Sequence, residues 1–185
     1  MADMDKYPLC TIELNGRTFQ AFTAPDDCGD MPWERDDGRG PVSDWRKRES
    51  KRAGELVLCE DRGSCRFYDF AAAVKLARKD GWGAHSQKCD YYRSKVCQCG
   101  AAALSKGAQA EKAARMDFEF LRGYCRGDWY YVGVIVKCEG EHESVWGIES
   151  NADEYLKETA HDLATELDRC LRDQAQCAQV AKAFL

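Results

Sequence analysis

The sequence predicts an α+β fold, in which an antiparallel sheet built from three β-hairpins is covered by two or three helices. The first observation is that three pairs of β-prone segments, within 11–23, 55–70 and 128–150, are each joined by a polar or glycine-containing turn. The second is helical apolar spacing at 69–80, about 104–126 and 151–185. Because 185 residues is a usual single-domain length, we expect one α+β domain over 1–185.

The first hairpin is marked by its turn. Thr11–Leu14 and Arg17–Thr23 alternate apolar and polar residues on either side of Asn15-Gly16. Asn and Gly accept the two positive φ angles of a type I′ turn, whose twist matches that of paired strands. We therefore expect a hairpin with one buried face.

The second hairpin runs directly into a helix. Glu55–Glu60 and Arg66–Phe70 carry residues that suit a half-buried strand, and the turn at 61–64 contains Gly63. Asp69 can accept hydrogen bonds from the first free N–H groups of a helix over 69–80. Gly81 then follows as a left-handed C-cap, so the sequence indicates where this helix begins and ends.

The third hairpin carries the most apolar strand. It follows a predicted helix at about 104–126, which Gly127 ends. Apolar residues occupy consecutive positions at 134–136, which favours a central strand covered on both faces. We expect a polar loop at 139–143 and a returning strand at 144–150.

The C-terminal helix is predicted over 151–185. Its apolar stripe continues from Leu156 to Leu185, and at 1.5 Å per residue the helix would be about 50 Å long, which exceeds a small domain. We expect either a break near 173–176 or a helical overhang at about 169–185. Because an exposed apolar stripe favours association, the overhang suggests a homodimer through this helix.

A polar segment at 24–52 contains two tryptophans and ends in a basic run. Its proline, glycine and aspartate residues interrupt any periodicity, so we expect an ordered loop that the tryptophans hold against the sheet. Such a loop either closes one end of the sheet or binds a partner. The candidate partner-binding residues here are Trp33, Trp45, Arg46, Lys47 and Arg48.

Eleven cysteines are present, which is a high number for a chain of this length. Reduced thiols acting as small apolar side chains are one interpretation. A second is a zinc site in a cysteine-rich insertion at about 84–100, since zinc binds thiolate and imidazole ligands in tetrahedral array. His85 and Cys89 share a helical i, i+4 spacing, whereas Cys97-Gln98-Cys99 is tighter than a usual zinc knuckle. The candidate metal ligands are His85, Cys89, Cys97 and Cys99.

Charge is distributed unevenly along the chain, whose formal net charge is −5. Residues 139–173 hold eleven acidic residues against three basic ones, a local balance of −8. This argues against a uniformly basic nucleic-acid-binding protein and favours an acidic face that meets a basic partner. The candidate residues on that face are Glu154, Glu158 and Asp162.

Catalytic motifs are missing from the sequence. It has no glycine-rich phosphate loop, no H-E-x-x-H and no G-x-S-x-G, and its three histidines form no familiar pairing. We therefore expect a protein that is not an enzyme and that has no cofactor apart from the candidate zinc. The N-terminus lacks the features of a secretory signal, and no apolar run approaches a membrane span, so we expect a cytoplasmic protein with no membrane partner.

Four segments resemble a family of small bacteriophage and prophage accessory proteins. They are MPWERDDGRGPVSDW (31–45), GELVLCEDRGSCRFYDFAAAVKLARKDGWG (54–83), MDFEFLRGYCRGDWYYVGVIV (116–136) and ESVWGIESNADEYLKETAHDLATEL (143–167). The resemblance implies a phage product made in the host bacterial cytoplasm, and it carries no catalytic residue with it. The segment 85–99 and the tail beyond Asp168 depart from the family pattern.

Three functions follow as hypotheses. The first is a phage-encoded binding protein that inhibits or modulates a host protein or ribonucleoprotein complex, such as a CRISPR–Cas defence complex. The second is a nucleic-acid-associated protein that uses Arg46–Arg52 with Trp33 and Trp45 as a stacking platform. The third is a zinc-dependent enzyme that uses the cysteine-rich segment.

Overall fold

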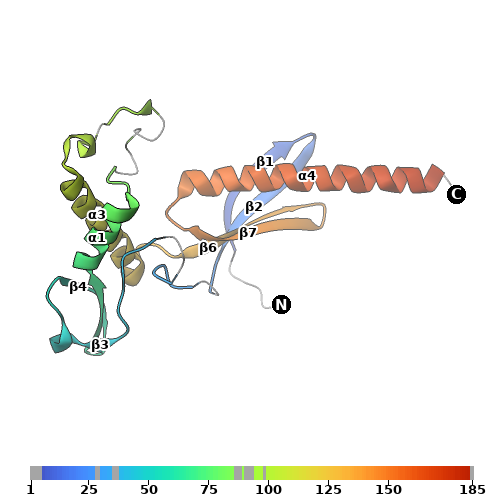
Figure 1. Ribbon diagram of the computed structural model, residues 1–185. Coiled ribbons are helices and arrows are strands. Elements are labelled where there is room, and N and C mark those ends of the chain that lie inside the picture. The colour runs from blue at the N-terminus through green and yellow to red at the C-terminus, as the bar shows by residue number, and fades with distance from the viewer. Residues whose placement is uncertain are drawn as a thin grey trace. The chain divides into compact units, whose positions relative to one another are not determined.

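A computed structural model describes residues 6–27, 30–34, 38–85, 89, 94–97 and 99–183, with side chains through residue 177 (Figure 1). The predicted α+β class is confirmed. The chain divides into two compact units: unit 1 comprises Met1–Gly29 and Trp129–Leu185, and unit 2 comprises Asp30–Asp128. The single-domain expectation stays a prediction.

Unit 1 is built on a four-stranded antiparallel sheet with strand order β1-β2-β6-β7. The first and third predicted hairpins form it, and β2 pairs with β6 between them. All of β6 is buried except Lys137, which confirms the predicted central strand. The strands are β1 (Tyr7–Leu14), β2 (Arg17–Pro25), β6 (Tyr131–Cys138) and β7 (Glu141–Glu149).

Both hairpins of unit 1 close through two-residue turns with positive φ angles. Asn15 and Gly16 have φ values of 51° and 78°, as the Asn-Gly pair predicts. Glu139 and Gly140 have φ values of 52° and 91° and form the turn between β6 and β7. The expected loop at 139–143 is therefore wrong, because Glu139-Gly140 alone reverses the chain and residues 141–143 already pair with β6.

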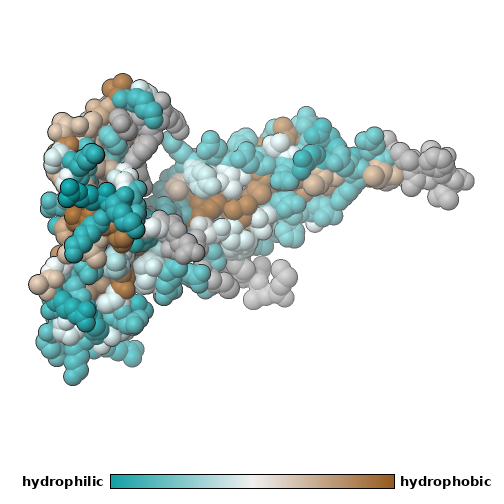
Figure 2. All heavy atoms as spheres, viewed as in Figure 1, coloured by the Kyte–Doolittle hydropathy of each residue, from teal (hydrophilic) through white to brown (hydrophobic). Residues whose placement is uncertain are grey.

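Helix α4 (Asp153–Ala183) covers one face of this sheet (Figure 1). Its apolar stripe packs with strand residues into one core, and Figure 2 shows apolar residues gathered between helix and sheet. The helix members of this core are Leu156, Ala160, Leu163, Ala164, Leu167 and Leu171. The helix does not break near 173–176, and the side chains at 172–177 are exposed, while the overhang expected at about 169–185 stays a prediction. No helix within the described ranges is long and apolar enough to cross a membrane.

A buried carboxylate on α4 holds both hairpin turns of unit 1. Asp168 is fully buried and accepts hydrogen bonds from Asn15 Nδ2 at 2.7 Å and from Arg17 Nη1 at 2.8 Å. Arg172, one helical turn later, lies 3.0 Å from the same carboxylate, and Arg17 also pairs with Glu139 at 3.1 Å. This buried charge therefore joins α4 to the turn between β1 and β2, in addition to the apolar packing.

The acid stability of unit 1 should depend on Asp168. The hydrogen bond from Asn15, followed by that from Arg17, holds the pKa of this carboxyl below its usual value. A depressed pKa stabilises the fold above the unfolded pKa of about 3.9, and this contribution is lost as the pH falls through the folded pKa. We expect thermal unfolding curves between pH 6 and pH 2 to show a steeper loss of stability for the wild type than for Asp168→Asn. Equal slopes would contradict this assignment.

Unit 2 contains a separate three-stranded antiparallel sheet with strand order β3-β5-β4. The expectation that all three hairpins join one sheet is wrong. The middle hairpin pairs instead with a short strand from the long loop, since Arg46 and Lys47 lie opposite Cys65 and Ser64 on β5. The strands are β3 (Arg46–Lys47), β4 (Glu55–Asp61) and β5 (Ser64–Asp69), and a 3-10 turn, η1 (Arg48–Ser50), follows β3.

Two helices pack together beside this sheet, and their caps match the sequence predictions. In α1 (Phe70–Asp80), the Asp69 side chain accepts a hydrogen bond from Ala72 N, and Gly81 has a φ of 70°. In α3 (Lys106–Arg126), Gly127 follows with a φ of 76°. Both helices contact β4 and each other. The shared core includes Leu58, Tyr68, Ala73, Ala114, Phe118 and Leu121.

The long loop is fixed to α3 by a buried polar network. Asp117 accepts hydrogen bonds from the Gly40 N–H and the Tyr68 hydroxyl, both at 2.8 Å, and Arg39 lies at 3.4 Å. Burial and the Asp117 carboxylate raise the pKa of Tyr68, which keeps the hydroxyl a donor. A Cβ atom at Gly40 would lie 2.3 Å from the Tyr68 hydroxyl oxygen, so this close approach requires glycine.

Candidate metal centre

The four predicted metal ligands come together in unit 2, beyond the C-terminal end of α1. Ala84, next to His85, is buried. On the other side of the site, Gly100 turns the chain with a φ of 74° and leads into η2 (Ala101–Ala103). Residues 86–88, 90–93 and 98 of the predicted insertion lie outside the described residues, and so does the expected helical spacing between His85 and Cys89.

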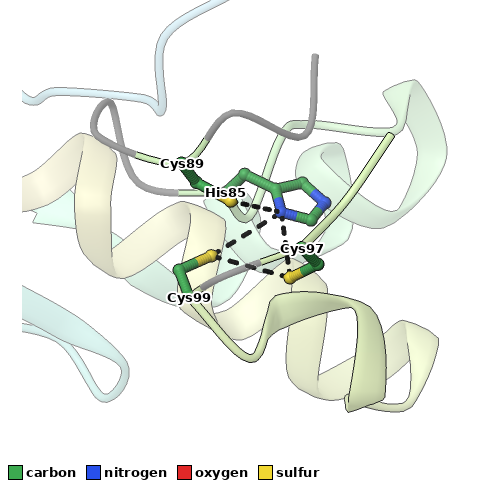
Figure 3. Close-up of side chains that lie close together, drawn as sticks. All are labelled: His85, Cys89, Cys97 and Cys99. Carbon is green, nitrogen blue, oxygen red and sulfur yellow. Dashed lines mark hydrogen bonds between the residues drawn. The ribbon is translucent and has the colours of Figure 1, made fainter. Parts of the chain in front are cut away.

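The four side chains point toward one another (Figure 3). His85 Nδ1 lies 3.7 Å from the sulfur of Cys89, 3.5 Å from that of Cys97 and 3.6 Å from that of Cys99. The sulfurs of Cys97 and Cys99 are 4.0 Å apart, and all four ligand atoms lie within 4.8 Å of one another. Cys89 is buried and the other three residues are partly buried, so the cluster is largely protected from solvent but an ion can enter it.

Two neighbouring groups face the sulfurs, and the sequence did not indicate either. The backbone N–H of Ala102 donates to Cys97 Sγ at 3.3 Å. On α3, the Lys112 ammonium lies 3.9 Å from Cys99 Sγ and 3.4 Å from the Cys99 carbonyl oxygen. Both stabilise negative charge on sulfur. Lys112 follows Cys99 by thirteen residues, so only the tertiary structure reveals it.

The cation that contacts the two tryptophans of the long loop is Arg66, which lies outside the predicted basic run. Trp33 and Trp45 both lie against one cation, since the Arg66 guanidinium carbon is 5.3 Å from the first ring and 5.2 Å from the second. Arg66 also donates to Ser43 O at 3.2 Å. Trp33 packs against the core of unit 2, whereas Trp45 is exposed, so the expectation that both tryptophans hold the loop down is wrong for Trp45.

The basic run beside these tryptophans is partly neutralised. Arg46 pairs with Glu55 at 2.7 Å, and Arg48 pairs with Glu60. Lys47 is exposed on the edge strand β3. A phosphate contact by either arginine must compete with its carboxylate, which weakens the case for a stacking and phosphate-binding platform.

The predicted acidic residues of α4 form a row. Glu154, Glu158 and Asp162 are all exposed and follow one another at i, i+4 spacing. Among the described residues, none of the three has an ion-pair partner. Figure 2 shows hydrophilic residues along the outer side of this helix. Like charges at this spacing destabilise a helix slightly, so the row is a cost to the fold.

Two of the described cysteines outside the site are buried as small apolar side chains would be. No disulfide forms among the described cysteines, and Cys65 and Cys138 are buried. Burial raises the pKa of Cys138, and burial together with the adjacent Cys59 thiol raises the pKa of Cys125 to about 12. The raised pKa keeps the Cys125 and Cys138 thiols protonated at neutral pH, unlike a metal-bound thiolate.

Comparison of the chain with protein-family models, with curated proteins and with solved structures finds no match. The resemblance to phage accessory proteins therefore stays a prediction. The structure itself defines an α+β protein with a four-residue Cys₃His cluster.

Proposed function

We propose that this protein is a non-enzymatic binding protein whose acidic unit contacts a basic surface on a macromolecular partner. The observation that carries the proposal is a segregation of charge between the two units. Unit 1 contains 7 Lys and Arg against 16 Asp and Glu, a net charge of −9, whereas unit 2 contains 20 against 16, a net charge of +4. The overall value of −5 conceals this division.

The acidic row on α4 is the part of unit 1 best placed for such a contact. Glu154, Glu158 and Asp162 extend over two helical turns on a rigid element whose opposite side is fixed in the core. Complementary charge accelerates association and discriminates between partners. A row of carboxylates can also occupy a channel that normally holds phosphates, which is consistent with a host protein or ribonucleoprotein complex as the partner.

The number of side chains in the candidate metal centre supports the assignment of a protein that is not an enzyme. A catalytic zinc ion keeps one coordination position open for water or substrate, whereas four protein side chains surround this site. The nucleic-acid alternative has the positive charge of unit 2 in its favour, but Arg46 and Arg48 are already paired with carboxylates.

Charge reversal on α4 tests the proposal. We expect the tagged full-length chain to recover a partner from bacterial lysate at constant stoichiometry. The triple variant Glu154→Lys, Glu158→Lys, Asp162→Lys should bind that partner at least about tenfold more weakly, because like charges would then face each other. Added salt should also lower the affinity of the wild-type protein for that partner, since salt screens exposed charges.

The matched control changes the same number of charges elsewhere. Asp61→Lys, Asp80→Lys, Glu111→Lys alters three exposed acids of unit 2 and should leave the complex intact. Equal loss in both variants would show a net-charge effect and contradict a binding face on α4. Loss of the complex on nuclease treatment would favour the nucleic-acid alternative instead.

A further inference from the structure

We propose that His85, Cys89, Cys97 and Cys99 hold one structural Zn²⁺ ion. The site lies in unit 2, whereas the acidic row of α4 belongs to unit 1. Both ligand types, thiolate and imidazole, are those of structural zinc sites, in which Cys₃His is one of the common sets.

Four of the six distances between ligand atoms are close to those around a single tetrahedral ion. Zinc lies about 2.3 Å from thiolate sulfur and about 2.0–2.1 Å from imidazole nitrogen, which places the ligands about 3.8 Å (sulfur to sulfur) and about 3.6 Å (nitrogen to sulfur) apart. The three nitrogen–sulfur distances of 3.5, 3.6 and 3.7 Å match this geometry. The 4.0 Å separation of the Cys97 and Cys99 sulfurs is slightly wider.

The same distances distinguish between metals. Tetrahedral sites rich in thiolate suit zinc or iron–sulfur centres, while magnesium and calcium require oxygen ligands. An iron–sulfur cluster would interpose several irons and sulfides between its ligands. Since all four ligand atoms lie within 4.8 Å of one another, they have room for one ion.

Charge around the site also favours a thiolate-bound cation. Three thiolates and a neutral imidazole around Zn²⁺ leave a net charge of −1. Lys112 lies 3.9 Å from one sulfur, and the Ala102 N–H points at another. Such outer groups commonly hold zinc ligands in their charged form, and their loss weakens metal binding.

Packing explains what the ion stabilises. The cluster of buried residues next to the site consists of alanines, which remove little apolar surface from water. These are Ala77, Ala84, Ala101, Ala110 and Ala113, with Val74, Trp82, Cys97 and Cys99 packed against them. The ion would link the segment after α1 to the segment that precedes η2 and α3, where the buried residues are small.

Metal content and coordination geometry test the assignment. The full-length chain, expressed with added zinc and purified under reducing conditions, should contain one zinc per chain. Cys97→Ser should reduce the zinc content below one tenth of that value, whereas Cys177→Ser, an exposed thiol outside the site, should not change it. Absence of zinc from the wild type, or equal zinc in both variants, would overturn the proposal.

Cobalt keeps the test valid even if the Cys97→Ser variant fails to fold. Co²⁺ added to the metal-free wild type should give the visible absorption and thiolate charge-transfer bands of a tetrahedral centre, and one equivalent of Zn²⁺ should displace it. An octahedral cobalt spectrum would indicate adventitious binding and overturn the assignment. Lys112→Ala should weaken zinc affinity about 10- to 100-fold, and Lys112→Arg should restore it.

Discussion

Removal of zinc by a chelator is expected to lower the free energy of unfolding of unit 2 by about 4 kcal/mol. This value is for a comparison with protein in free zinc at about 1,000 times the dissociation constant. The physical reason is linkage, since an ion that binds only the folded site stabilises it by mass action. The buried residues next to the site are alanines, with Val74 and Trp82 packed against them, so the apolar packing there is modest. The loss should therefore be concentrated between Ala84 and Ala114.

Hydrogen exchange followed by mass spectrometry locates this effect. On chelation, amides at 84–114 should lose protection, while those of α4 and of β6 should keep theirs, because they belong to unit 1. Readdition of zinc should restore protection in the wild type but not in Cys97→Ser. Unchanged protection of residues 84–114 in metal-free protein would contradict a structural role for the ion.

Replacing Asp117 with alanine is expected to destabilise unit 2 by about 3 kcal/mol. The substitution leaves two buried donors, the Tyr68 hydroxyl and the Gly40 N–H, without their acceptor, and each such loss costs about 1–3 kcal/mol. The charge of Arg39 also loses its nearby partner. Chemical denaturation of the full-length chain with zinc present measures the difference.

Tyr68→Phe serves as the matched control because it removes one donor and leaves the carboxylate and the ring packing in place. We expect a cost of about 1 kcal/mol, well below that of Asp117→Ala. If the two variants were equally stable, the carboxylate would not organise the loop. Metal content should be unaffected in both, since neither residue lies in the Cys₃His site.

Local chemistry made most element boundaries predictable. Asn15-Gly16 places the first turn, Asp69 and Gly81 begin and end α1, and Gly127 ends α3, because each position needs a backbone angle or hydrogen bond that few residues provide. The prediction of a loop at 139–143 was wrong for a related reason. A positive φ at Glu139 is uncommon, so the sequence did not favour a two-residue turn there.

The candidate metal ligands were predicted from residue type alone. That their ligand atoms lie close together was visible only in the folded structure. The spacing His85-x₃-Cys89-x₇-Cys97-x-Cys99 differs from the common zinc knuckle, so pattern alone was weak evidence. Lys112 and Arg66 act on ligands and aromatic rings that are distant in sequence. No local periodicity could have indicated either residue.

By itself, the sequence determined the hairpins, the helices and their caps, and the set of four candidate ligands, because these depend on neighbouring residues along the chain. Only the tertiary structure decided that the hairpins divide between two sheets, that Arg46 and Arg48 are paired with carboxylates, and that four ligand atoms meet within 4.8 Å. These outcomes depend on which distant segments pack together. Strand pairing and the geometry of a metal site are set by contacts between residues far apart in the chain, and neighbouring residues do not indicate those contacts.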